Sequence, residues 1–149
     1  MIRRGFLAVD PMLLEWILRA SESARQIPMS AEGNVRHWQG HEECKSLEIP
    51  FLRVAASLTG ESTPLAKARW WANVLRTGAG YRPHRHDGKW SFAYHLTEGA
   101  TLHFDGCDSF PAIPGQILVF DSKLRHWTDK VEGDAPRVSI AGNLHFKSR

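Results

Sequence analysis

Three histidines in two segments of the chain have the types and spacing of metal ligands. His84 and His86 lie in RPHRHD, and His126 follows the apolar run QILVFD in the segment SKLRHW. Side chains alternate across a strand, so His84 and His86 share one face and can reach one ion, whereas Asp87 faces away unless a bulge intervenes. Two neighbouring ligands and one distant ligand would hold a metal from one side and leave its other positions open.

A third segment, RVSIAGNLHF, supplies a cation and a hydroxyl. Arg137 stands eleven positions after His126, and alternation puts it on one face with Ser139, opposite an apolar face that carries Val138 and Ile140. An inward-facing guanidinium needs an anionic partner. A carboxylate fits its planar fork of donors, and the Ser139 hydroxyl can add another donor. The alternative is a surface Arg137 paired with Asp134.

These segments, in this order, resemble the iron(II)- and 2-oxoglutarate-dependent oxygenases, in which a His-x-Asp/Glu pair, a distal His and an Arg-x-Ser recur. The resemblance runs from Trp70 to Phe146, and it is carried by WANVLRTGAGYRPHRHDGKWSFAYHL and PGQILVFDSKLRHW. Small bacterial oxygenases and the aspartyl/asparaginyl β-hydroxylase branch look most similar. The resemblance implies iron(II) bound by His84 and His126, and the distal carboxylate of 2-oxoglutarate bound by Arg137 and Ser139. It also implies a dioxygenase that uses molecular oxygen to hydroxylate a small molecule or an amino-acid side chain.

The chain departs from the family pattern at one position, because His86 stands where the carboxylate ligand is usual. Three models follow. His84, His86 and His126 form a three-histidine site; or Asp87 swings in through a bulge; or His86 does not bind, as in the β-hydroxylase branch, which has a glycine there. We favour the first model.

Two other function classes compete with the oxygenase. GYRPHRHD and PGQILVFDSKLRH also resemble cupin motifs, which suggests a three-histidine metal protein that does not use 2-oxoglutarate. The glutamate that cupins place after the histidine pair is missing, however, and Trp90 and Ser91 stand there. The third class is a non-catalytic barrel that only holds a ligand. The pair Arg137 and Ser139 favours the oxygenase over the cupin, and intact iron ligands speak against the third class.

Other aromatic residues and histidines receive structural interpretations. Large aromatics dominate cores, so we expect barrel packing from Trp70, Trp71, Trp90 and Phe92. We assign no ligand role to His37, His41 and His145. His95 and His103 lie on expected strands and are candidates for the pocket wall.

The elements that must position these residues are mainly β. From residue 68 onward, short β-branched and aromatic runs alternate with Gly, Pro and Asp, which predicts seven or eight strands in a double-stranded β-helix, a jelly-roll or cupin-like barrel. Asp10 as N-cap, Pro11 and the apolar period after them predict one amphipathic helix packed outside the barrel. We expect a single domain over 1–149, with a helical part at about 1–67 and the barrel at about 68–147. Within the first part, 26–46 is expected to be loop and 64–67 a turn or short helix.

Composition narrows the compartment and the partners. The net charge of +3 and pI near 9.1 come from scattered basic residues, so a nucleic-acid partner is not favoured. No segment approaches the roughly 20 apolar residues of a membrane span. Cys44 and Cys107 are too few for a disulfide framework, so we expect free thiols and a cytoplasmic protein. Asp10 and Glu15 interrupt the apolar run that a signal peptide needs, so the N-terminus is expected to belong to the fold.

Overall fold

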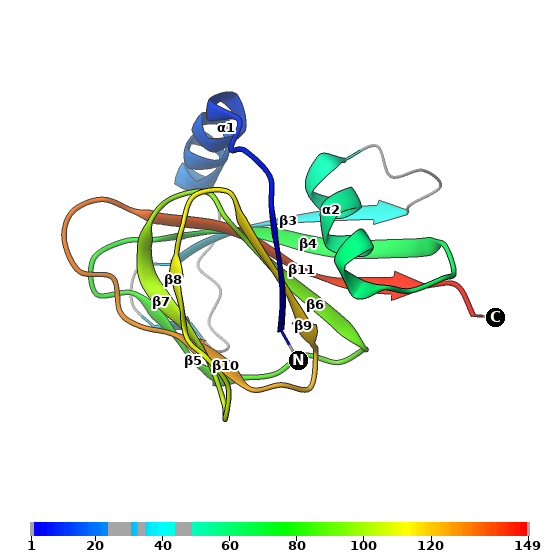
Figure 1. The fold of residues 1–149 in the computed structure, drawn as a ribbon. Helices are drawn as coiled ribbons and strands as arrows, with labels where there is room; N and C mark the ends of the chain where they lie inside the picture. The colour runs from blue at the N-terminus through cyan, green and yellow to red at the C-terminus, as the bar shows by residue number, and fades with distance from the viewer. Residues whose placement is uncertain (1, 24–30, 33–34, 44–48, 149) are drawn as a thin grey trace.

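The computed structural model describes residues 2–23, 31–32, 35–43 and 49–148 of the chain. It is mostly β, with two antiparallel sheets facing each other and two helices outside them (Figure 1). The strands are β1 (Ile2–Phe6), β2 (Ala31–Glu32), β3 (Val35–Glu43), β4 (Leu65–Leu75), β5 (Gly80–His84), β6 (Trp90–His95), β7 (Gly99–Phe104), β8 (Phe110–Ala112), β9 (Gln116–Asp121), β10 (His126–Thr128) and β11 (Arg137–Phe146). The helices are α1 (Pro11–Glu22) and α2 (Pro50–Thr59).

The two sheets have the strand order of a jelly roll. The six-stranded sheet runs β1-β9-β6-β11-β4-β3, and the five-stranded sheet runs β2-β5-β10-β7-β8. Because neighbours in each sheet come from distant parts of the chain, β11 lies between β4 and β6, and β10 lies between β5 and β7. This arrangement brings the segments around His84, His126 and Arg137 onto two facing layers. The prediction of a double-stranded β-helix is confirmed.

Both helices cover the outer face of the six-stranded sheet. The side chain of Asp10 caps α1 by accepting a hydrogen bond from the backbone N–H of Met12 at 2.9 Å, as the sequence predicted. Helix α2 runs from Pro50 to Thr59 and is capped by Gly60, whose φ of 72° is the left-handed conformation that glycine adopts without strain. Helix α1 packs against β3 and β4, and α2 packs against β9, β1 and β6.

Alternation along the strands separates an outer core from the barrel interior. On β11, Val138, Ile140 and Leu144 point to the helices and pack with Ile17 of α1 and Leu52 of α2. A second apolar cluster lies between the sheets and consists of Ala93, Leu102, Phe104, Leu118 and Phe120. The helices therefore bury one face of the large sheet, and its other face is left to line a cavity.

The structure of the N-terminal part, residues 1–67, differs from the prediction, which was a helical part with one helix. It contains three strands in addition to the two helices. The expected loop at 26–46 includes β3, an edge strand with the sequence VRHWQGHEE. Edge strands commonly carry charged residues, so the apolar alternation that reveals a strand is absent from it. The expected turn at 64–67 is the beginning of β4.

Helix α2 had a readable signal that was missed. Its buried residues, Phe51, Leu52, Ala55 and Ala56, recur at helical spacing after Pro50. Ile49 occupies the N-cap and makes no side-chain hydrogen bond, so the usual polar start signal is lacking. The N-terminus belongs to the fold as expected, because β1 pairs with β9 from Ile2↔Phe120 to Phe6↔Gln116.

Candidate metal centre

The three predicted histidine ligands meet inside the barrel. His84 ends β5 and His126 begins β10, and the two residues are paired across these antiparallel strands. His86 follows two residues after the end of β5. One ring nitrogen from each histidine can be chosen so that all three lie within 4.8 Å of one another. Asp87 is exposed and outside this cluster, so the geometry matches the three-histidine model among the three alternatives.

The rings of His84 and His126 are oriented by their own backbone. Nδ1 of His84 lies 2.6 Å from the carbonyl oxygen of Arg82, and Nδ1 of His126 lies 3.0 Å from that of Leu124. A carbonyl only accepts, so each Nδ1 carries the hydrogen and each Nε2 keeps its lone pair. Metal-binding histidines commonly donate a hydrogen bond from the N–H of the other ring nitrogen to a carbonyl in this way.

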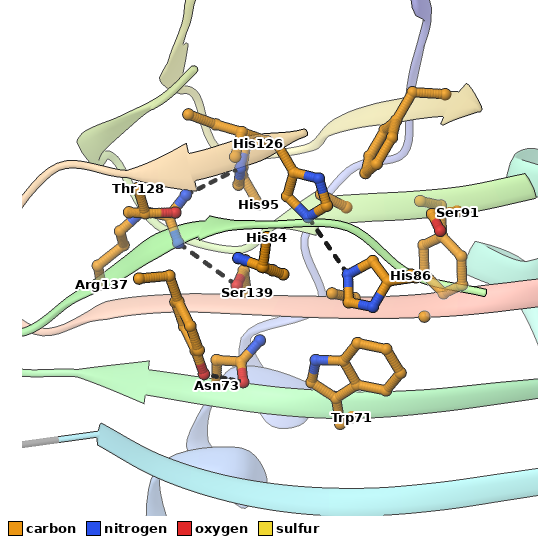
Figure 2. A pocket seen from close by; sticks show the side chains of 17 residues that line it. Trp71, Asn73, His84, His86, Ser91, His95, His126, Thr128, Arg137 and Ser139 are labelled. Atoms are coloured by element: carbon orange, nitrogen blue, oxygen red, sulfur yellow. Dashed lines mark hydrogen bonds between the residues drawn. The ribbon is translucent and has the colours of Figure 1, made fainter. Parts of the chain in front are cut away.

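His86 completes the donor set. Its Nε2 lies 3.3 Å from Nε2 of His126, as Figure 2 shows. Two nitrogens that share one ion at about 2.1 Å each, roughly at right angles, are about 3 Å apart. The spacing and the ligand chemistry therefore fit a divalent transition metal such as iron(II).

Burial keeps these imidazoles in the neutral, ligating form. It lowers the pKa of His84, it lowers the pKa of His86 to about 4, and it lowers the pKa of His126 to about 3. The electrostatic influence of His84 adds to the lowering at both other rings. At neutral pH no proton has to leave before a metal binds.

A cavity of about 250 Å³ joins the histidines to Arg137. In Figure 2, Arg137 lies on one side of His84, and His86 lies on the other. The wall is lined by residues of β4, β5, β6, β7, β9, β10 and β11. Its polar members besides the three histidines are Asn73, Tyr81, Ser91, His95, Thr128, Arg137 and Ser139.

Arg137 is a buried cation at one end of this cavity. Arg137 is 3% exposed, and its Nε donates a hydrogen bond to the carbonyl oxygen of Ala100 at 2.9 Å. Nη2 lies 3.2 Å from Nε2 of His95, and Nη1 lies 3.5 Å from Oγ of Ser139. Burial lowers the pKa of Arg137 to about 10, so the group stays charged at neutral pH. Within the described ranges no carboxylate forms an ion pair with it, and the alternative surface pair with Asp134 is wrong.

Sequence reasoning missed three polar residues near this cation. Tyr81 donates a hydrogen bond from its hydroxyl to Oδ1 of Asn73 at 2.8 Å, and Thr128 faces the same cavity. Burial raises the pKa of Tyr81, so its hydroxyl stays protonated and able to donate. Alternation along β4 was the available signal for Asn73, because it puts this polar side chain on the face opposite Ala72 and Val74. In the structure Asn73 is paired with Ser139 across β4 and β11.

The remaining aromatic residues and histidines divide between the cavity and the surface. Trp70 and Trp90 pack in the outer core as expected, but Trp71 lines the cavity, with its ring centroid 5.7 Å from that of His86. His95 lines the cavity, whereas His103 hydrogen-bonds Ser109 and Asp129 on the surface. His145 is outside both the metal cluster and the cavity lining. Cys107 is a free, exposed thiol. Cys44 and the side chains of His37 and His41 lie outside the described residues.

Comparison with known proteins gives matches by structure alone. No protein-family model matches the sequence, and no match was found among curated proteins. A prolyl-4-hydroxylase from Pseudomonas putida superposes with a TM-score of 0.70 at 15% identity, over 97% of this chain and 93% of that one. A viral collagen prolyl hydroxylase from Paramecium bursaria Chlorella virus 1, solved with 2-oxoglutarate, gives 0.65 at 11% identity, over 96% and 94%.

The chain has the fold of the 2OG-Fe(II) oxygenases. A cupin-like protein from Thermotoga maritima shares this architecture, with a TM-score of 0.50 at 13% identity, over 78% of this chain and 78% of that one. No helix of the described residues is long and apolar enough to cross a membrane.

Proposed function

We propose that the protein is an iron(II)- and 2-oxoglutarate-dependent dioxygenase that hydroxylates a C–H bond of a small molecule or an amino-acid side chain. The observation that carries the proposal is the buried Arg137, whose charge faces a cavity shared with three histidines and has no carboxylate partner among the described residues. A buried charge is costly unless it is paired, so the site favours an anionic ligand.

The residues divide the binding of cofactor between the two ends of the cavity. His84, His86 and His126 would hold iron(II), and Arg137 with Ser139 would bind the distal carboxylate of 2-oxoglutarate. When bound, iron and the keto acid together activate oxygen for oxidation of a C–H bond. The protein supplies placement and charge. No side chain has to act as a nucleophile or general base, because the oxidation chemistry belongs to the cofactors.

The lining of the cavity suits this chemistry. Trp71, Phe92 and Phe120 give the wall an apolar surface, and the polar groups are concentrated at the histidines and around Arg137. Apolar walls exclude water and strengthen the electrostatic contacts of a bound anion. The likeness to two prolyl hydroxylases supports an amino-acid side chain as the substrate class.

The cupin alternative rests on the third histidine. A three-histidine site without a carboxylate ligand is compatible with a metal protein that does not use 2-oxoglutarate, and a cupin-like protein shares the fold. A metal protein without 2-oxoglutarate would not require a buried cation in the cavity of the metal cluster. The charge of Arg137 therefore favours the oxygenase.

Anaerobic titration tests the proposal before any substrate is known. Protein loaded with iron(II) should develop a weak visible charge-transfer band on addition of 2-oxoglutarate, and admission of air should yield succinate slowly. Protein loaded with manganese should bind 2-oxoglutarate without turnover. If neither metal form binds 2-oxoglutarate, the oxygenase proposal is wrong and the cupin alternative becomes the better account.

A further inference from the structure

Three buried side chains form a hydrogen-bonded chain that ends on Arg137. His95 is 0% exposed and Gln116 is 7% exposed. Nη2 of Arg137 lies 3.2 Å from Nε2 of His95, and Nδ1 of His95 lies 3.1 Å from Oε1 of Gln116. A guanidinium only donates, so Nε2 of His95 must accept, and Nδ1 carries the hydrogen that it donates to Gln116.

The contacts therefore require a neutral imidazole. A protonated ring has no lone pair for Arg137 and would place a second cation beside it. Burial and the charge of Arg137 both lower the pKa of His95, to about 3, in agreement with that geometry. The ring holds the guanidinium without adding or cancelling charge.

A carboxylate would be the ordinary partner for a buried arginine, since it makes the stronger, charge-assisted contact. It would also neutralise the cation. His95 and the carbonyl of Ala100 instead provide two uncharged acceptors from neighbouring parts of the barrel, on β6 and β7. These acceptors use the Nε–H and one N–H of Nη2, and the guanidinium keeps further N–H groups for a ligand.

We propose that His95 is a positioning residue that fixes the Arg137 guanidinium while leaving its positive charge available to the distal carboxylate of the keto acid, with Gln116 setting the tautomer of His95. The inference rests on the proposed function. It makes a specific demand: the partner of Arg137 must be an acceptor and must be neutral.

Two variants of equal size separate these requirements. In His95→Gln the amide offers an oxygen to Arg137 and an N–H to Gln116, so it reproduces the neutral contacts. In His95→Glu the carboxylate also accepts from Arg137 but cancels its charge. A merely structural role for His95 would not favour the neutral replacement. His145→Glu adds the same negative charge outside the cavity, near Lys67 and Arg69, and is the matched control.

The measurement is calorimetry on the full chain loaded with manganese, using 2-oxoglutarate and 2-oxopentanoate, which lacks the distal carboxylate. The dissociation constant of 2-oxopentanoate divided by that of 2-oxoglutarate reports on the carboxylate contact, and a higher ratio means a stronger contact. We expect His95→Gln to stay within about threefold of wild type, and His95→Glu to lose at least about thirtyfold in this ratio, the scale of a charge-assisted contact. Affinity for 2-oxopentanoate and for manganese should change little.

Equal loss in both variants, or an unchanged ratio in His95→Glu, overturns the proposal while leaving 2-oxoglutarate binding intact. A wild-type protein that does not discriminate between the two keto acids would instead contradict the proposed function. If His95→Glu does not fold, Gln116→Glu places the negative charge one hydrogen bond further away. It should lower the ratio by a smaller factor, about three- to tenfold, and no reduction there also overturns the proposal.

Discussion

His126 and His84 face each other across the antiparallel pair of β10 and β5, with ring centroids 4.3 Å apart. The chain separates the two residues by more than forty positions, but the sheet makes them neighbours. The register between β5 and β10 shifts beyond this pair, between His126 and Thr128. An irregularity of the strand pairing therefore lies immediately beside the two candidate ligands.

Replacement of His126 by Ala should abolish tight metal binding. The change removes the ligand from β10 and leaves two histidines from one segment, so we expect a loss of at least about a hundredfold in affinity for iron(II) or manganese. Metal content after purification and manganese titration measure it. His103→Ala changes a side chain of β7 that lies outside the cavity, so this control should bind metal normally. One tightly held iron per chain in His126→Ala would show that the distal ligand is wrongly assigned.

Comparison of three further variants distinguishes the ligand models. His84→Ala should be as damaging as His126→Ala, because His84 contributes an oriented Nε2. His86→Asp should keep or improve iron binding by restoring a carboxylate ligand. His86→Ala should weaken metal binding by about tenfold or more under the three-histidine model. Wild-type affinity in His86→Ala would support the two-histidine model instead.

Replacement of Arg137 by Ala should weaken 2-oxoglutarate binding by about 2 to 4 kcal/mol, or about thirtyfold to several hundredfold, through loss of a charge-assisted contact. Metal affinity should survive. Arg137→Lys should recover only part of the loss, since an ammonium keeps the charge but lacks the planar fork. Calorimetry with manganese gives both constants, and the exposed Arg76→Ala is the control. Equal keto-acid binding in Arg137→Ala and wild type would contradict the carboxylate assignment.

Replacement of Gly142 by Ala should destabilise the barrel. A Cβ at Gly142 would lie 2.3 Å from the carbonyl oxygen of Arg69 and 2.7 Å from Cε1 of Phe92. Overpacking of this kind costs about 1 to 3 kcal/mol in free energy of unfolding. Gly133→Ala is a useful comparison, because nothing lies within 4 Å and only its φ of 81° opposes the change, at about 1 kcal/mol. Urea denaturation measures both, and equal stability of Gly142→Ala and wild type would contradict the packing.

Residues with strong periodicity could be predicted, and residues defined by distant pairing could not. The alternation in RVSIAGNLHF correctly put Arg137 and Ser139 on the face opposite Val138 and Ile140. Along β4, alternation puts Trp70 on an apolar face with Ala72 and Val74, and it puts Trp71 on the opposite face with Asn73. Which of the two faces turns toward the cavity depends on the pairing of β4 with β11, in which Trp71 lies opposite Ala141.

The same limit applies to His95. Its segment, WSFAYHL, predicts a strand, but the tautomer and the partner of the ring depend on β9 and β11, which lie on either side of β6. A long-range contact of this kind has no local signature. Edge strand β3 was not predicted for a different reason, because its polar sequence lacks the alternation that a half-buried strand shows.

The alternation along β11 also bears on how this protein could change over time. Val138, Ile140 and Leu144 hold the helices, while Arg137, Ser139 and Ala141 form part of the cavity wall. The two sets of side chains lie on opposite faces of the same strand, separated by its backbone. New ligand preferences could therefore be acquired through inward positions of one strand while the outward positions keep the scaffold folded. A saturation scan of β11 should divide its tolerated substitutions by odd and even residue number.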